Sequence, residues 1–478
     1  MQKILGQVRR CVEDYHMIDA GDVVAVGVSG GKDSLVTLTA LARLRAFYPI
    51  PFTVRAITLE TGAPGMSFDA VADLCRQLEV PYTRIQVPVY DIVFNERKEK
   101  NPCSLCAKLR RGSLNTALTD LGIRKIALGH HFNDVIETTV LGMFFGSDGV
   151  VKIPFDNYGL AQNICSFALI FIMFYGGFNT NIDRAKPVAV PAVLLSTLGV
   201  VITAGITGAF AHFVLGFDWI GGLLLGSVVA STDAASVFSV LREHSLSLRG
   251  GTDSLLEVES GSNDPVAYML TAVLATLAAG GDINIPVLLA KQIILGVGLG
   301  LAIGWASSRL IERTRATAEG AQTIFLFAVA IVAYALPSYL GGNGFLAVYL
   351  AGIVLGASDI TGKVEMAHFF DTLTEMAEMT IFFLLGLLVT PARLPQMLLP
   401  GLALMAFMLF ASRPIAVGLL LAPFKTSPRQ VALVSWAGLR GAASVVFSLF
   451  AVVAGVPGGH DLFDLVFVIA VSSIVLRR

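Results

Sequence analysis

The sequence predicts an α-helical polytopic membrane protein preceded by a partial, doubly wound α/β domain. Asp, Glu, Lys and Arg make up roughly 22% of residues 1–146 but only roughly 11% of residues 147–478, whereas a soluble protein has about 25%. About eleven apolar runs follow, and most approach the roughly 20 residues that a membrane helix needs. We therefore expect two domains, residues 1–146 and 147–478.

The N-terminal region begins with a short buried strand over 22–28, followed by a glycine turn and a helix. The turn consists of Ser29, Gly30, Gly31, Lys32, Asp33 and Ser34. A strand, a glycine turn and a helix N-terminus form an anion site, because backbone N–H groups and the helix dipole favour phosphate. The spacing is not that of a Walker A loop. Further strands near 53–59 and 125–128, with helices between, indicate a doubly wound fold.

The glycine turn resembles the PP-loop of ATP pyrophosphatases. Two later segments, Pro102–Arg111 and Gly129–Thr138, are similar to the tRNA 2-thiocytidine synthetase branch of that family. The resemblance implies that Ser29 to Ser34 contact the phosphates of ATP, and that Asp33 and Asp134 hold Mg²⁺.

In that branch two cysteines ligate an iron–sulfur cluster together with a third cysteine further along. Cys103 and Cys106 match the pair, but the chain turns hydrophobic before a third cysteine appears. We therefore expect the C-terminal half of a PP-loop protein to be missing. The resemblance then implies neither a complete cluster nor tRNA as a partner, and a cysteine pair without metal remains the alternative.

The apolar runs form the second region, and glycine is frequent within them, as in closely packed membrane helices. The runs lie near 160–177, 189–211, 219–240, 255–279, 288–309, 321–337, 343–357, 378–391, 396–422, 430–455 and 462–476.

Every second linker between these runs carries Lys or Arg, whereas the linkers between them carry none except Arg393, which is the positive-inside pattern. The pattern places Arg477 and Arg478 inside and Tyr158, at the start of the first run, outside. An ATP-using domain belongs in the cytoplasm, yet here it precedes an outward-facing end. We therefore expect an odd number of helices to be missing; a first run that does not span is the alternative.

Ionisable residues lie inside the apolar runs, among them Glu257 and a set of four, Asp233, Glu259, Asp264 and Arg440. Each charge at mid-membrane costs about 2.5–3.5 kcal/mol, so four would cost on the order of 10 kcal/mol. We expect these side chains to face a cavity and to pair with one another. A structural ion pair or a position at the membrane surface remains open for each.

The residues around these carboxylates suit a monovalent cation, which prefers carboxylate, hydroxyl and carbonyl oxygens. Ser260 and Asp264 share one helix face, and Asn263 can orient a neighbouring carboxylate. Thr232 and Asp233 are expected where a helix is broken, with Gly438–Gly441 as the matching break in a second half. A carboxylate that binds either a proton or a cation produces exchange by competition.

These segments resemble the monovalent cation:proton antiporters, which include bacterial Na⁺/H⁺ and K⁺/H⁺ exchangers. The matching segments are 149–157, 231–235, 259–265, 345–352, 412–414 and 438–442. The resemblance implies an inverted-repeat fold, alternating access, a homodimer and the bacterial inner membrane, with no cofactor for transport.

The resemblance also assigns roles to individual residues. Asp264 is the essential ion and proton carboxylate, and Asn263 marks the electroneutral branch. Ser260 and Thr232 supply oxygens, and Glu259 supports them. Arg440 and Asp233 organise the broken-helix crossing, and Arg413 lies in the 412–414 segment.

The chain departs from the antiporter pattern at its N-terminal side, where we expect about two helices to be absent. The two regions therefore look like an abnormal gene fusion or an artefact of sequence assembly, and both explanations stay open. Four readings remain open: a cation/proton antiporter, an ATP-dependent tRNA-modifying enzyme with a membrane region, a membrane scaffold or channel with no proton coupling, and an inactive fusion. The sequence leaves Na⁺ and K⁺ as equal candidates.

Overall fold

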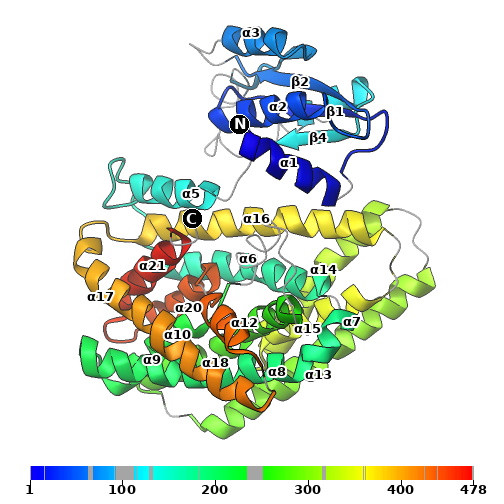
Figure 1. Ribbon diagram of the computed structural model, residues 1–478. Coiled ribbons are helices and arrows are strands. Elements are labelled where there is room, and N and C mark those ends of the chain that lie inside the picture. Colours follow the sequence, from blue (N-terminus) through cyan, green and yellow to red (C-terminus); the bar gives the residue numbers. More distant parts are fainter. Residues whose placement is uncertain are drawn as a thin grey trace. The chain divides into compact units, whose positions relative to one another are not determined.

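The computed structural model divides into two compact units, Met1–Phe132 and Asn133–Arg478 (Figure 1). The description covers residues 2–14, 17–62, 68–90, 92, 112–114, 116–128, 133–180, 182–233, 251–281, 283–314, 319–358, 360, 362–424, 426–438 and 440–475.

The first unit is a four-stranded parallel sheet in the order β3-β2-β1-β4. Its elements are α1 (Gln2–Asp14), β1 (Val23–Gly27), α2 (Lys32–Leu44), β2 (Thr53–Glu60), α3 (Asp69–Gln77), β3 (Tyr82–Gln86) and β4 (Lys125–Leu128). Both faces of the sheet are covered. Val24 and Val26 pack with Leu38 and Leu41 on one side, and Leu118 lies in the cluster on the other. The predicted α/β fold is confirmed; β3 had not been predicted.

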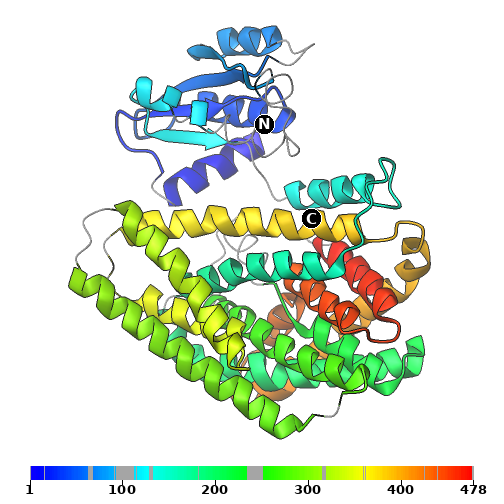
Figure 2. The same cartoon turned by 180° about the vertical axis from the view of Figure 1, so that it is seen from behind.

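The second unit is helical (Figures 1 and 2). Its long helices are α5 (Asn133–Phe145), α6 (Tyr158–Asn179), α9 (Val200–Leu215), α10 (Trp219–Ala230), α12 (Thr252–Ala278), α13 (Ile285–Thr314), α14 (Glu319–Tyr339), α15 (Gly344–Ala357), α16 (Lys363–Leu388), α17 (Leu394–Phe407), α20 (Ala442–Val453) and α21 (Gly459–Val475). Shorter pieces are α7 (Ile182–Ala185), η2 (Lys186–Val188), α8 (Ala189–Leu194), η3 (Leu195–Gly199), η5 (Met408–Ser412), α18 (Arg413–Leu421), η6 (Ala422–Phe424) and α19 (Pro428–Trp436).

Polar side chains set the starts of several helices. Asn157 accepts a hydrogen bond from the Leu160 N–H at α6, Asp218 from the Gly221 N–H at α10, and Asn343 from the Leu346 N–H at α15. Such caps satisfy backbone donors that have no partner within the helix. Inside a membrane this satisfaction matters more, because water is absent.

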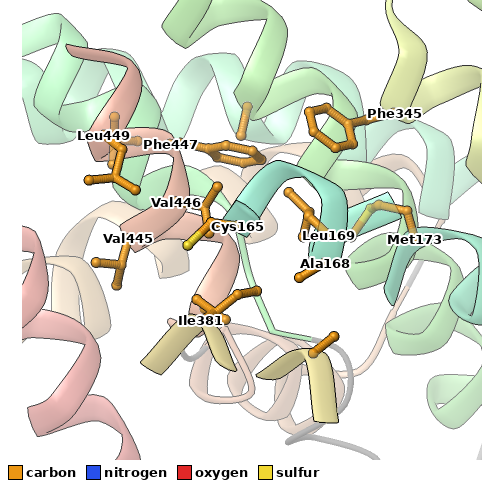
Figure 3. Packing of buried hydrophobic residues seen from close by; sticks show 14 of the residues in the cluster. Cys165, Ala168, Leu169, Met173, Phe345, Ile381, Val445, Val446, Phe447 and Leu449 are labelled. Carbon is orange, nitrogen blue, oxygen red and sulfur yellow. The ribbon is translucent and has the colours of Figure 1, made fainter. Parts of the chain in front are cut away.

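Helix α6 lies at the centre of the second unit. Cys165, Leu169 and Met173 of α6 pack with Phe345 of α15, Ile381 of α16 and Phe447 of α20 (Figure 3). Gly177 brings α6 close to α15, since a Cβ there would lie 3.0 Å from the Ile353 nitrogen. These apolar contacts hold the halves of the unit together.

Two helices of this unit are broken. Helix α10 ends at Ala230, and Ser231 is no longer helical, with a φ of −58° and a ψ of 135°. Helix α19 ends at Trp436 and α20 begins only at Ala442. A π-helical turn, η3 or η5, lies in the helix before each break. The two sets correspond in order along the chain, as an inverted-repeat fold requires.

Five helical stretches of the described chain are long and apolar enough to cross a membrane. They are Tyr158–Asn179, Lys186–Leu215, Ile285–Arg313, Gln322–Tyr339 and Leu394–Phe424. Helices α10, α15 and α20 are apolar but shorter. The figure of about eleven spans therefore stays a prediction.

Helix α5 belongs to the second compact unit, although the predicted domain boundary at Gly146 assigns it to the first. Its packing gives the reason. A Cβ on Gly142 would lie 3.0 Å from the Gly386 Cα, so α5 and α16 meet at backbone distance. The division between the units thus precedes α5, at Phe132/Asn133.

Candidate ion-binding site

Asp264 lies near the middle of α12, and its side chain is 5% exposed. The following residue, Pro265, has no N–H and so removes one hydrogen bond of the helix ladder. The Pro265 carbonyl oxygen accepts a 2.8 Å hydrogen bond from Nδ2 of Asn343, the N-cap residue of α15. Helix α12 is therefore tied to α15 beside the buried carboxylate.

The broken end of α10 meets Asp264. Ser231 Oγ, the first side chain beyond α10, donates a hydrogen bond to Asp264 Oδ1. Ser231 is 1% exposed. A buried carboxylate therefore faces the point where α10 stops.

A second contact joins the same two segments. Asn263 Nδ2 donates to Thr232 Oγ1, which in turn donates to Ser260 Oγ at 3.3 Å. All three side chains are buried. Within the described residues, Asn263 Oδ1 is buried and accepts no hydrogen bond. Asp264, Asn263, Ser260 and Thr232 thus come together around one small volume rich in oxygen.

Arg440 closes the other side of this volume. Its Nη1 donates to the carbonyl oxygens of Ala230 at 3.0 Å and Ser231 at 2.7 Å. The carboxyl end of a helix carries partial negative charge, which a cation stabilises. The Arg440 backbone is fixed as well, because its N–H donates to Ser473 Oγ at 2.9 Å.

Asp233 lies against the second break. A Cβ on Gly441 would lie within 2.6 Å of Asp233 Cβ, so only glycine lets the two segments approach this closely. Arg440, which precedes Gly441, binds the carbonyl oxygens at the end of α10. The two helix breaks therefore cross, and the Asp233 carboxylate and the Arg440 guanidinium lie at the crossing.

Glu259, one turn before Asn263 on α12, pairs with Arg413 of α18. The Glu259 Oε1 to Arg413 Nη1 distance is 2.9 Å, and the side chains are 1% and 3% exposed. Arg413 Nη2 also donates to Glu259 Oε2 and to the Val434 carbonyl oxygen, each at 3.4 Å. The pair is internally neutral and ties α12 to α18 and α19.

The glycine turn of the first unit has the geometry of an anion site. Gly30 has a φ of +84°, and α2 begins at Lys32, directly after Gly31. Ser34 Oγ donates to the Gly31 carbonyl oxygen at 2.9 Å and accepts from the Ser29 N–H at 3.3 Å. Residues 29–32 are exposed at the carboxyl end of β1, and Asp33 lies in the first turn of α2.

Three predicted metal-binding residues cannot be placed. Cys103 and Cys106, and the side chain of Asp134, lie outside the described residues. The described residues contain no group of three or more His, Cys, Asp and Glu side chains that could hold a metal ion.

The sequence prediction missed three side chains at the crossing: Ser231, Ser473 and Asn343. Ser231 directly precedes the predicted break, which was a usable signal. Ser473 and Asn343 lie more than 30 residues from the residues they contact, Arg440 and Pro265. Only the tertiary fold brings them there.

Comparison with known families separates the two regions. Residues 128–477 match the family model described as sodium/hydrogen exchanger, transmembrane, and residues 3–159 match the PP-loop domain model. The two matches overlap across α5.

Curated relatives agree with this division. A K⁺/H⁺ antiporter, NhaP2, of Shewanella sp. (strain ANA-3) is 39% identical over 343 residues, which are 70% of this chain and 59% of the relative. A K⁺/H⁺ antiporter, NhaP, of Alkalimonas amylolytica is 38% identical over 71% of this chain and 59% of its own length. A tRNA-cytidine(32) 2-sulfurtransferase of Burkholderia cenocepacia is 42% identical over 146 residues, 30% of this chain and 44% of that protein.

A solved structure shares the fold of the helical unit. The sodium proton antiporter MjNhaP1 from Methanocaldococcus jannaschii aligns with a TM-score of 0.63 and 23% identity, over 76% of this chain and 92% of that one. The chain spans 59% of the length of the antiporters it matches in sequence. Since the exchanger model matches well over half of the residues, the chain belongs to the sodium/hydrogen exchanger family.

Proposed function

We propose that the chain exchanges a monovalent cation, Na⁺ or K⁺, for protons across a membrane, with Asp264 as the carboxylate that carries either ion. The observation that carries this proposal is the burial of Asp264 at the broken end of α10, where Ser231 Oγ donates to it. An intramembrane carboxylate at a helix break is the usual setting of a transported ion.

The surrounding oxygens suit a dehydrated cation. Asp264 Oδ1 and Oδ2, the hydroxyls of Ser231 and Thr232, and Asn263 Oδ1 are hard ligands of the kind alkali ions prefer. Asn263 Oδ1, with no hydrogen bond from the described residues, is available for this purpose. When a proton occupies Asp264 the carboxylate loses its charge, and the cation loses its principal ligand. Competition for one carboxylate therefore couples the two fluxes.

We further propose that the exchange is electroneutral, one cation for one proton. Glu259 is neutralised by Arg413 within the fold. Asn263 carries no charge, so Asp264 is the ionisable member of the Asn263–Asp264 pair. One exchangeable negative charge binds one monovalent cation or one proton, and the loaded carrier has the same charge in both states.

The names of the similar proteins point to two different cations. Two matched proteins are named K⁺/H⁺ antiporters, and the structural neighbour is named a sodium proton antiporter. We keep both ions as candidates, because the same oxygens serve each. Assembly as a homodimer in a bacterial inner membrane belongs to the same proposal.

Proton flux in everted vesicles tests the proposal. Vesicles that contain the chain should release protons when Na⁺ or K⁺ is added, and Asp264→Asn should abolish the release. Asp461→Asn is the matched control, because Asp461 is about half exposed and pairs with Arg393 at the surface. Cation-dependent release that persists in Asp264→Asn would refute the assigned role, and its absence from the unmodified chain would refute antiport.

We propose nucleotide binding by the first unit as a second activity, favoured by the geometry of Ser29 to Ser34. The exposed N–H groups of the turn, the positive φ of Gly30 and the N-terminus of α2 suit a polyphosphate. Asp33 is placed in the first helical turn, where it can reach Mg²⁺ bound to that polyphosphate. An adenylating enzyme of the tRNA-thiolation kind is the corresponding enzymatic alternative.

A further inference from the structure

Helix α5 runs alongside the C-terminal half of α16 (Figure 1). Gly142 faces Phe383 and Gly386, and four residues later Gly146 faces Leu387. A Cβ on Gly142 would lie 3.0 Å from Gly386 Cα, and one on Gly146 would lie 2.7 Å from the Leu387 carbonyl oxygen. Because residue numbers rise together along both helices, α5 and α16 point in the same direction.

The carboxyl ends of α5 and α16 and the amino end of α6 lie at the same side of the helical unit. Tyr158, the first residue of α6, donates from Oη to the Leu388 carbonyl oxygen at 3.3 Å. The pattern of basic linkers puts this side of the membrane outside, and it puts the start of α16, which carries Lys363, inside. Helix α5 therefore points outward from a deeper start at Asn133.

The surface of α5 suits lipid along its outer portion. Val140, Leu141 and Phe144 are 58%, 51% and 45% exposed, whereas Thr139, beside Gly386, is buried. The acidic residues of α5, Asp134 and Glu137, lie in its first turns. In a helix of this kind the apolar end can lie among the acyl chains, while the charged end lies at the membrane surface.

The length of α5 is close to what a crossing needs. Thirteen residues at about 1.5 Å each span about 20 Å of a hydrocarbon core about 30 Å thick. Helices α10 and α15 of the same unit have similar lengths, 12 and 14 residues.

We propose that α5 crosses the membrane as part of the helical unit, with Val140, Leu141 and Phe144 against lipid acyl chains. The residues before Asn133, including the turn of Ser29 to Ser34, then lie on the cytoplasmic side. This assignment supplies the odd helix that the charge pattern requires, and it places a nucleotide site where ATP is present. It depends on the membrane fold and not on transport.

Labelling of single cysteines in the full-length chain tests this crossing. The five native cysteines are replaced, and one cysteine is introduced at Ala46, Val140, Val150 or Arg429. Ala46 and Arg429 are exposed residues of the first unit and of a predicted inner linker, and Val150, between α5 and α6, is 74% exposed. A membrane-impermeant maleimide is added to everted and to right-side-out vesicles, and total thiol is measured after denaturation.

Ala46→Cys and Arg429→Cys should label at least tenfold faster in everted vesicles, and Val150→Cys at least tenfold faster in right-side-out vesicles. Val140→Cys should label in neither and fully after denaturation. Labelling of Ala46→Cys and Val150→Cys from the same side would overturn the crossing. Rapid labelling of Val140→Cys in intact vesicles would place α5 in water and would also overturn it. Antiport activity affects neither readout.

Discussion

Arg440 Nη1 lies 2.7 Å from the carbonyl oxygen of Ser231, so the guanidinium of one helix break satisfies the open end of the other. The same Ser231 donates its hydroxyl to Asp264. Ser231 thus contacts the Arg440 guanidinium through its backbone carbonyl and the Asp264 carboxylate through its side chain. Through Ser231, the geometry of the Asp264 carboxylate depends on Arg440, which lies 209 positions from Ser231 along the chain.

Replacement of Arg440 should therefore impair transport, although Arg440 itself does not contact the ion in the proposed mechanism. Arg440→Ala leaves the Ala230 and Ser231 carbonyl oxygens without their donor, and each charge-assisted hydrogen bond contributes about 1.5–3 kcal/mol. We expect at least a tenfold loss of cation-dependent proton flux, with partial retention in Arg440→Lys, which keeps the charge but has a single nitrogen. Equal flux from Arg440→Ala and the unmodified chain would exclude this role.

The buried pair of Glu259 and Arg413 should behave as one unit. Loss of one partner leaves an uncompensated buried charge, which costs about 3–5 kcal/mol, so Glu259→Gln and Arg413→Gln should each lower the thermal midpoint in detergent. The double variant should lose less than the sum of the two. The exposed pair of Arg393 and Asp461 is the control, because such a pair contributes about 0–1 kcal/mol to stability. Strictly additive losses for Glu259 and Arg413 would argue against the pairing.

The contact between α5 and α16 should tolerate no side chain at Gly142. A Cβ there would meet backbone atoms of Phe383 and Gly386, which cannot move aside as a side-chain tip can. We expect Gly142→Val to destabilise the helical unit by about 1–3 kcal/mol through overpacking. Gly176→Val, where nothing lies within 4 Å of the added Cβ, is the control. The comparison uses thermal midpoints of the two purified variants, and similar values would contradict the close approach.

Nucleotide binding should be separable from transport. Lys32→Ala should weaken binding of a fluorescent ATP analogue at least tenfold, because it removes the positive charge at the start of α2. Gly30→Val should do the same by straining a φ of +84° that favours glycine. Arg43→Ala, in the last turn of α2, is the control with the same charge change. Unchanged affinity in both loop variants would place any nucleotide elsewhere.

The first unit should lose stability in acid through Asp22. Lys125 Nζ lies 2.6 Å from Asp22 Oδ2, and this hydrogen bond holds the pKa of Asp22 below its usual value. A carboxyl with a lowered pKa stabilises the fold above pH 3.8, its unfolded value, and the contribution is lost as pH falls below that.

Lys125→Met should accordingly destabilise the first unit at pH 7 more than at pH 3, by about 0–1 kcal/mol for a pair this exposed. Cys75, buried in the first unit, reports the change. In a variant whose sole cysteine is Cys75, the temperature at which a disulfide reagent reaches the thiol gives the midpoint at each pH. An equal shift at both pH values would show that the ion pair is not the cause.

Local pattern predicted much of this architecture. The strand before Ser29, the glycine turn and the helix after it follow from neighbouring residues, and the apolar runs follow from composition. The helix breaks at Thr232–Asp233 and at Gly438–Gly441 carry their own signal, because small and charged residues interrupt apolar sequence.

What escaped prediction depends on distant contacts. The sequence indicated that Glu259 needs a partner, but the choice of Arg413, 154 residues away, follows from how α12 and α18 cross. The membership of α5 was equally hidden, since its sequence resembles the end of a PP-loop segment while its glycines fit α16.

In the proposed mechanism one carboxylate, that of Asp264, binds a proton and a cation in competition. The most direct measurement is proton release on addition of Na⁺ or K⁺ to the purified chain in weakly buffered detergent solution, followed with a pH indicator. The proposed mechanism predicts saturable release of one proton per chain, and no release from Asp264→Asn. The release should depend more steeply on the concentration of the cation that is transported than on that of the other cation. Saturable cation binding with no proton release, or release that is unchanged in Asp264→Asn, would contradict it.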